Sequence, residues 1–207
     1  MLFSYNWIQK YIKGKLPGPD KLADLLNMHA FEVEGMNKKG TDTLLDIAVL
    51  PNRAHDCLSH VGMAREIAAI AKLKFLSPKT KTIKMQKGTL KPIKVSIQSS
   101  ELVPRYTALL IEGVQIGKSP KWLAERLQAL GAHSINNVVD LTNFIMLELG
   151  QPLHAFDYDQ IMGGEMTIRE ARNGEKLETL DGKLLSLPKG VLVIEDADRL
   201  IDLAGIK

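Results

Sequence analysis

The sequence predicts an α+β protein built from short helices and short strands. In several stretches apolar residues recur every three or four positions, as in amphipathic helices, and the clearest of these is residues 137–149. In others, such as residues 93–97, apolar and polar residues alternate as in a half-buried strand. A lysine-rich stretch separates two regions of this kind. We therefore expect a small helical module with a hairpin at 1–76, a basic linker at 77–92 and a mixed α/β module at 93–207.

The composition is that of a globular protein, with 45% hydrophobic and 25% charged residues among 207. A net charge of +3 does not by itself indicate a nucleic acid partner. The single cysteine, Cys57, excludes an internal disulfide and suits a reducing compartment. No signal peptide is recognisable, and no apolar run approaches the roughly 18 residues that span a bilayer. We therefore expect a cytoplasmic protein that does not contact a membrane.

The first module contains signals for three helices and a hairpin. Ser4 is expected to cap a helix that ends at Gly14, and Asp20 to cap a second, leucine-rich helix. A third helix should follow Pro51, with Asp56 or Ser59 as its cap, and the alternating residues 31–34 and 45–49 predict two strands joined by the turn Lys38-Lys39-Gly40.

The second module mixes strand and helix signals. The mostly apolar run 106–111 predicts a buried strand, and Ser119-Pro120 can begin a helix that Gly131 ends. The last strand pattern, residues 200–206, ends without a turn or polar tail, so its edge needs a partner and we expect the chain to be part of a longer protein. Other strands are expected at 93–97, 166–169, 177–180, 184–187 and 191–194, with a hairpin turn at Asp181-Gly182.

The central stretch, residues 137–157, is organised as a helix that stops abruptly. Asn137 can cap its start, Gly150 can take the left-handed conformation at its end, and Pro152 prevents continuation. The chain should then leave as an extended run. The apolar residues that recur at helical spacing are Val138, Leu141, Ile145 and Leu149, with Phe144 beside them.

Three polar side chains of this stretch form a candidate site. If the extended run folds back along the helix, His154 lies beside Thr142 and Asn143, because about seven helical residues and four extended ones cover similar lengths. A hydroxyl, a carboxamide and an imidazole against an apolar wall are typical of a small-ligand pocket. The alternative is a helix cap, a turn and a histidine with ordinary partners, without any chemistry.

A basic strip lies between the two modules. It contains six lysines and no acidic residue, and Lys84, Lys87 and Lys91, with Arg105 further on, are candidates for contacts with RNA phosphates. The alternative is a linker that its charges keep solvated.

The run His55-Asp56-Cys57 with His60 contains residue types that bind metals. A zinc site needs three or four converging ligands, and no second pair of ligands is recognisable elsewhere in the sequence. We therefore expect no metal site, but a helix start at which Asp56 acts as a cap and Arg53 forms a pair or contacts backbone.

Several motifs, in order, resemble the beta subunit of bacterial phenylalanine–tRNA ligase. They cover nearly the whole chain, and their order and spacing make the match specific. The motifs are Pro51-Asn52-Arg53, Asp56-Cys57-Leu58-Ser59 and residues 138–157, supported by residues 4–12 and 22–35, Val103-Pro104-Arg105-Tyr106 and Leu180-Asp181-Gly182.

The sequence departs from the family pattern in two ways. Most bacterial members carry an oligonucleotide-binding domain in the first module, whereas here Gly35 leads to Asp46 within about a dozen residues, so that domain and its contact with tRNA are absent. Family members are also several times longer. The chain therefore resembles an N-terminal fragment that stops inside the tRNA-binding and editing module.

The resemblance implies an aminoacyl-tRNA ligase subunit. Family members join phenylalanine to tRNA-Phe with ATP and magnesium, but that active site belongs to the alpha subunit, so no cofactor is expected in this chain. The expected partners are tRNA-Phe and the alpha subunit, in a heterotetramer of two alpha and two beta subunits. The beta subunit's contribution would be tRNA binding and hydrolysis of wrongly made tyrosyl-tRNA, since a synthetic pocket cannot reject a slightly larger analogue indefinitely.

The family's editing residues match particular positions here. The resemblance gives His154, Thr142 and Asn143 the catalytic roles: the pair would orient the ester, the terminal ribose or a water, and His154 would hold the ester or assist proton transfer. The substrate-binding wall would be Pro152, Ala155, Ala204 and Gly205.

Two other readings remain beside an editing role. The family's glutamate that recognises the tyrosine hydroxyl would lie beyond Lys207, so we expect the isolated chain to be almost inactive. The two other readings are that the chain is a non-catalytic docking and RNA-binding piece of the ligase, or that it is a free-standing editing-type domain. The match of the first 75 residues weakens the free-standing reading.

Overall fold

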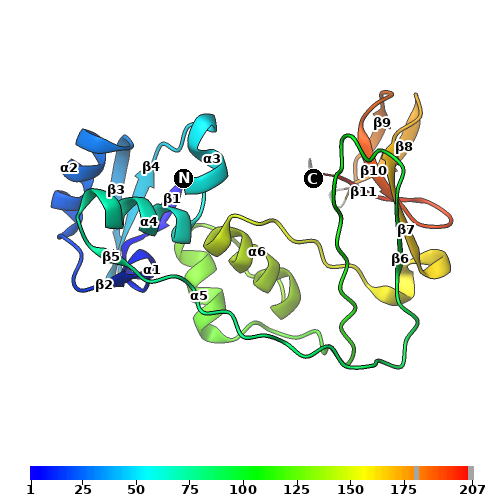
Figure 1. Ribbon diagram of the computed structural model, residues 1–207, viewed down its shortest axis with the longest axis horizontal. Helices are drawn as coiled ribbons and strands as arrows, with labels where there is room; N and C mark the ends of the chain where they lie inside the picture. The colour runs from blue at the N-terminus through cyan, green and yellow to red at the C-terminus, as the bar shows by residue number, and fades with distance from the viewer. Residues whose placement is uncertain (180–181, 205–207) are drawn as a thin grey trace. The chain divides into compact units, whose positions relative to one another are not determined.

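The computed structural model describes residues 1–179 and 182–204. The chain forms two compact units: unit 1 comprises residues 1–83 and 115–155, and unit 2 comprises residues 84–114 and the described part of 156–207 (Figure 1). Unit 1 combines six α-helices with short strands, and unit 2 is built mainly of strands with two short 3₁₀-helices, so the described chain has the predicted α+β class. Residues 115–155 pack with the first unit, although the sequence had placed them in the second module. The proposed domain limits at 76 and 93 stay a prediction.

The N-terminal part of unit 1 begins with β1 (Leu2–Ser4) and α1 (Tyr5–Gln9). Ser4 caps α1 as expected, because its Oγ accepts a hydrogen bond from the Trp7 amide at 2.9 Å. The helix is shorter than predicted. Ile12, which was expected to extend it, lies in β2 (Ile12–Lys13) and pairs with Phe75 of β5 (Lys74–Phe75).

A three-stranded sheet and three helices complete this part. The sheet has the order β1-β4-β3, and the antiparallel pairing of β3 (Val33–Lys39) and β4 (Asp42–Ile47) confirms the predicted hairpin, although Lys38 and Lys39 belong to β3 and not to the turn. Only Gly40 and Thr41 separate the two strands, so no inserted domain lies here. The helices are α2 (Pro19–His29), α3 (Pro51–Cys57) and α4 (His60–Ile70).

The predicted cap Asp20 is wrong, whereas Ser59, one of the two alternatives for the helix after Pro51, is confirmed as a cap. Gly18, with Pro19 directly after it, begins α2, and Asp20 lies inside the first turn. Ser59 caps α4 by accepting from the Gly62 amide at 3.0 Å, whereas Asp56 is inside α3. Backbone geometry, and not residue type alone, selects the position of the cap.

Helices α5 (Lys121–Ala129) and α6 (Asn137–Leu149) pack on α1 and α4 within unit 1 (Figure 1). Leu123 and Leu127 of α5, Phe144 of α6 and Trp7 of α1 form one buried cluster. A larger core beneath it joins the sheet to α2 and α4. The first cluster supports α6 against α1 and α5.

Unit 2 contains a four-stranded sheet of order β11-β10-β7-β6 and a separate hairpin, β8-β9. Strand β6 runs parallel to β7, and the other neighbours are antiparallel. The elements are β6 (Lys94–Ile97), η1 (Tyr158–Gln160), η2 (Met162–Gly164), β7 (Glu165–Glu170), β8 (Glu175–Glu178), β9 (Leu184–Leu187), β10 (Leu192–Glu195) and β11 (Leu200–Leu203).

The strand predicted at 106–111 does not form. This run has no regular structure and pairs with no strand among residues 1–179 and 182–204, and Leu109 and Ile111 are 61% and 65% exposed. An apolar run becomes a strand only where a neighbour accepts its backbone hydrogen bonds, and a sequence pattern does not show this. Residue 181 of the predicted hairpin turn lies outside the described residues. No helix in the described part of the chain is long and apolar enough to cross a membrane.

Candidate functional site

The helix α6 carries the candidate groups Thr142 and Asn143 and has well-defined ends. Asn136, one residue before the predicted cap, accepts hydrogen bonds from the amides of Val138 and Val139, each at 3.0 Å. Gly150 ends the helix with a φ of +78°, as predicted. The helix therefore stops where the sequence placed its end, and the chain leaves towards Pro152 and His154.

Thr142 and Asn143 are both half-buried on this helix. The Thr142 hydroxyl donates to the Val139 carbonyl oxygen at 2.8 Å. Its hydrogen is thus directed into the helix, and the lone pairs of Oγ1 remain as acceptors. Thr142 can therefore accept a hydrogen bond from a hydroxyl or a water, and the Asn143 carboxamide can donate or accept one.

His154 lies in an extended segment, 151–157, that is neither helix nor strand, and its side chain is exposed. Pro152 and Ala155, the predicted wall residues, are exposed as well. The predicted approach of His154 to Thr142 and Asn143 stays a prediction. What the structure shows is the abrupt helix end that such an approach requires.

The remaining wall residues belong to unit 2. Ala204 is half-buried and packs against the cluster of Met166, Ile168 and Ile194, and its amide donates to the Leu192 carbonyl oxygen at 3.0 Å. Gly205 lies outside the described residues. Ala204 thus has a fixed backbone position at the end of β11.

A pocket of about 240 Å³ in unit 2 begins two residues after His154. Its apolar and charged side chains come from three separate segments of the chain, so no local pattern in the sequence marks it. Apolar side chains beside an arginine and two carboxylates could hold a small molecule with an apolar body and charged ends. The lining residues are Phe156, Asp157, Gln160, Ile161, Glu178, Arg199, Leu200 and Ile201.

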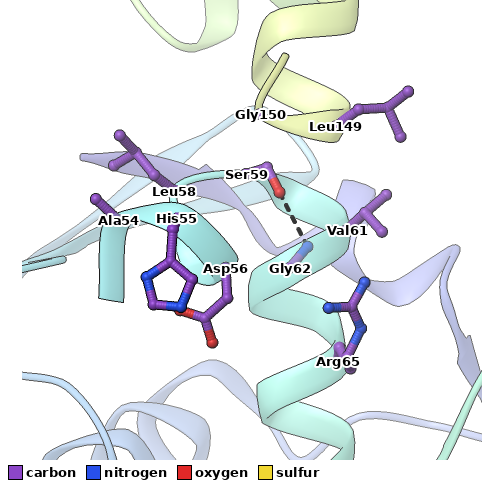
Figure 2. A pocket seen from close by; sticks show the side chains of 10 residues that line it. All are labelled: Ala54, His55, Asp56, Leu58, Ser59, Val61, Gly62, Arg65, Leu149 and Gly150. Carbon is purple, nitrogen blue, oxygen red and sulfur yellow. Dashed lines mark hydrogen bonds and ion pairs between the residues drawn. The ribbon is translucent and has the colours of Figure 1, made fainter. Parts of the chain in front are cut away.

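A second pocket, of about 210 Å³, lies in unit 1 where α3, α4 and the end of α6 meet (Figure 2). His55, Asp56 and Arg65 stand around it, and Ser59 and Gly62 form its capped helix start. A side chain at Gly62 would place its Cβ 1.9 Å from the Asp56 carbonyl oxygen. The pocket wall therefore depends on a close contact between backbones of α3 and α4.

Arg53 holds the wall of this pocket together with two ion pairs. Its guanidinium contacts Asp56 at 2.8 Å and Glu66 at 2.9 Å, which confirms the expected pairing. Hydrogen bonds from Arg53 lower the pKa of Asp56 to about 2. Burial raises the pKa of the Cys57 thiol to about 12, so this cysteine is a weak nucleophile and a poor metal ligand.

His60 points away from His55 and Cys57 into the core. Its Nε2 accepts from the Ser4 amide at 3.1 Å, and its Nδ1 lies 2.8 Å from the Leu147 carbonyl oxygen. Among residues 1–179 and 182–204, no three histidine, cysteine or acidic side chains form a group that could hold a metal ion.

The candidate RNA-binding residues Lys84, Lys87, Lys91 and Arg105 are all exposed in unit 2. Sequence reasoning missed an acidic partner of this segment. Glu112 accepts from the amides of Thr89 and Leu90 at 2.8 and 3.0 Å, and the bond from Leu90 lowers its pKa. The basic segment is therefore tied to the stretch that includes Arg105 by a local clamp.

The second half of the chain matches the model of a known domain family. Residues 102–207, about half of the chain, match the model of the B3/4 domain. The chain therefore belongs to the B3/4 domain family.

The curated relatives are all beta subunits of phenylalanine–tRNA ligase, which confirms the predicted resemblance. That of Anaeromyxobacter dehalogenans is 49% identical over 165 residues, covering 80% of this chain and 20% of the relative. That of Rhodopirellula baltica is 37% identical over 206 residues, covering 100% of this chain and 30% of the relative. That of Geobacter metallireducens is 44% identical over 187 residues, covering 87% and 22%. The chain thus spans a fifth to less than a third of these relatives.

One solved structure covers almost the whole chain. It is an N-terminal fragment of the phenylalanyl-tRNA synthetase beta subunit from Pyrococcus horikoshii, with a TM-score of 0.47 and 14% identity over 99% of this chain and 61% of the other. A TM-score below 0.5 does not establish a shared arrangement of elements.

Proposed function

We propose that the chain works as part of a phenylalanine–tRNA ligase, together with an alpha subunit and tRNA-Phe in a heterotetramer of two alpha and two beta subunits. The names of the relatives support this role. ATP and magnesium would be bound by the alpha subunit, so the charging chemistry lies outside this chain. The complex would work in the cytoplasm.

The contribution of the chain would be to the hydrolysis of mischarged tyrosyl-tRNA. Thr142 would accept a hydrogen bond from the ribose or the attacking water, Asn143 would orient the ester, and His154 would hold the ester or assist proton transfer. The observation that carries this proposal is the geometry of α6. Its left-handed end at Gly150 stops the helix, and the chain reaches His154 four residues later.

Because the chain spans less than a third of its relatives, the chain alone would hydrolyse tyrosyl-tRNA slowly.

The test is release of tyrosine from tyrosyl-tRNA by the ligase complex with the chain in its natural length. We expect His154→Ala and Thr142→Ala to lower the rate at least about tenfold, the lower end of what positioned acid–base or orienting groups supply. His133→Ala, which changes an exposed histidine before α6, is the control and should leave the rate unchanged. A wild-type rate in both site variants would contradict the editing role.

A non-catalytic role in docking and RNA binding is the second candidate. It is favoured by the exposure of the basic segment with Lys84, Lys87 and Lys91, which has no regular structure of its own. This role is compatible with the first, and its own test is the salt dependence treated below.

A further inference from the structure

Helix α6 has one face that is anchored and another that presents the candidate groups. Asp140, Phe144 and Glu148 are spaced four residues apart, so they share a face. Asp140 and Phe144 are buried, and Glu148 is half-buried. Thr142 lies midway between the first two and therefore points away from them. Whatever holds the anchored face also sets where Thr142 and Asn143 point.

The C-terminal end of the anchored face is held by a carboxylate with two donors. Glu148 Oε1 accepts a hydrogen bond from Trp7 Nε1 at 3.2 Å and another from the Tyr11 hydroxyl. Both donors come from the first dozen residues of the chain. Burial, and then the hydrogen bond to Glu148, raise the pKa of Tyr11, so this hydroxyl keeps its proton and remains a donor.

Aromatic stacking holds the middle of the same face. The Phe144 ring stacks on Trp7 with centroids 4.9 Å apart, and Trp7 stacks on His60 at 4.0 Å. The Arg126 guanidinium lies 4.7 Å from the centre of the Trp7 ring. Stacking permits sliding in the plane of the rings, whereas the hydrogen bond from Trp7 Nε1 to Glu148 fixes the position along that plane.

We propose that Glu148 is a positioning residue for the editing reaction, which holds α6 against Trp7 and Tyr11 so that Thr142 and Asn143 meet the ester. This inference rests on the proposed function. The N-terminal residues would then contribute to the reaction, although they supply no acid, base or nucleophile themselves. Glu148 acts through the helix and does not touch the substrate.

The expected size of the effect follows from the demands of orientation. A displacement of about 1 Å in a reacting group can lower a rate about 100-fold. Without Glu148, the donors of the buried Trp7 and the half-buried Tyr11 lose their acceptor and must seek water, so α6 would shift at its C-terminal end. The loss should appear in kcat more than in KM, because Glu148 acts on the orientation of Thr142 and Asn143 and does not touch the substrate.

The experiment compares Glu148→Ala, Glu148→Gln and Glu125→Ala in the natural-length protein with its alpha subunit. Glu148→Ala should lower kcat for tyrosyl-tRNA hydrolysis about 10- to 100-fold with KM within about threefold. Glu148→Gln keeps an oxygen that can accept both hydrogen bonds and should retain at least about a third of the wild-type kcat. Glu125, exposed on α5, is the matched control and should leave both parameters unchanged.

Tyr11→Phe is a second variant that tests the proposal if Glu148→Ala does not fold. It removes one donor and keeps the ring, so the protein should melt near the wild-type temperature by circular dichroism. Its kcat should still fall, and combining it with Glu148→Ala should add little, since both changes break the same bond.

The outcomes separate the two proposals. If Thr142→Ala is impaired but folded Glu148→Ala and Tyr11→Phe keep the wild-type kcat, the positioning role is wrong and the editing role survives. If Thr142→Ala and His154→Ala also keep the wild-type rate, both proposals fall. A loss of kcat in Glu148→Ala that Glu148→Gln restores supports the positioning role.

Discussion

His60 shows how a buried histidine can serve structure alone. It is fully buried between Phe3 and Trp7, and both ring nitrogens have partners, an amide that donates and a carbonyl oxygen that accepts. This arrangement requires the neutral ring with its proton on Nδ1. Burial, the largest cause, lowers the pKa of His60 to about 4.

The lowered pKa of His60 predicts a loss of stability in mild acid. The unfolded chain binds a proton near the ordinary pKa of 6.5 and the folded chain only near 4, so stability is complete above pH 6.5 and falls as the pH decreases towards 4. The loss should total about 3 kcal/mol, at about 1.4 kcal/mol per pKa unit. Urea unfolding followed by circular dichroism between pH 4.5 and 7 measures it.

The matched variants are His60→Gln and His133→Gln. The first should be less stable at neutral pH but should show a much flatter pH dependence in this range, and the second should behave as the wild type. An unchanged slope in His60→Gln would show that another group causes the acid sensitivity.

At the scale of single residues, the sequence identified candidate residue types but not the partners of their side chains. His55, Asp56, Cys57 and His60 are neighbours along the chain, yet Asp56 pairs with Arg53 and His60 turns into the core. Thr142 and His154 were identified from the lengths of the helix and the extended run and again through a resemblance, but the hydrogen bond that fixes the Thr142 hydroxyl was not foreseen. Side-chain direction depends on packing, which a linear pattern does not contain.

At the scale of elements, the ends of helices follow local rules closely. Gly150 and Gly131 both take the left-handed conformation just after a helix, with φ of +78° and +83°. They differ in their surroundings: a Cβ at Gly150 would lie 3.3 Å from the Ser59 Cβ, whereas a Cβ at Gly131 would meet nothing within 4 Å. Comparing substitutions at these two glycines therefore separates the cost of backbone strain from the cost of contact with α4.

Replacing each glycine by alanine should therefore have unequal effects. Gly131→Ala should cost about 1 kcal/mol, because a left-handed residue other than glycine is strained by roughly that amount. Gly150→Ala should cost more, about 2 kcal/mol, since the new methyl group also presses on Ser59. Denaturant melts of the two variants and the wild type measure both values. Equal losses would mean that the contact with Ser59 relaxes freely.

The buried face of α6 was harder to predict than its ends. The expected apolar stripe included Leu141 and Leu149, which are 49% and 46% exposed, whereas Phe144 and Asp140 are buried. Burial raises the pKa of Asp140, but hydrogen bonds from Ser119, Ser134 and the Ile135 amide outweigh it and leave the pKa below its ordinary value. The helix is apolar on more than one side, so only its neighbours decide which side is covered.

At the scale of the whole molecule, positive charge is concentrated in one segment. Eight lysines and no acidic residue occur from Lys72 to Lys94, although the net charge of the chain is only +3. Neutralising phosphates releases counterions, so any RNA affinity that depends on this segment must fall with salt. The segment is exposed throughout residues 79–91, which leaves it accessible to a partner.

Replacing Lys84, Lys87 and Lys91 together by alanine should weaken tRNA binding and flatten its salt dependence. Each lost phosphate contact removes about 0.7 to 0.9 from the slope of log affinity against log salt, so the slope should decrease by about 2 to 3. Fluorescence anisotropy with labelled tRNA from about 50 to 200 mM salt measures this range. The control replaces three exposed lysines of unit 1: Lys13, Lys15 and Lys21. An equal slope in both triple variants would leave the segment as a solvated linker.

The sequence by itself determined the α+β class, the hairpin at Gly40, the end of α6 at Gly150 and the family, because these depend on local backbone rules and on ordered motifs. Only the tertiary structure decided that 106–111 forms no strand, that α5 and α6 pack on Trp7, and that Glu148 accepts from Trp7 and Tyr11. These features depend on partners more than a hundred residues apart or on the absence of a neighbouring strand, and short-range patterns carry no information about either.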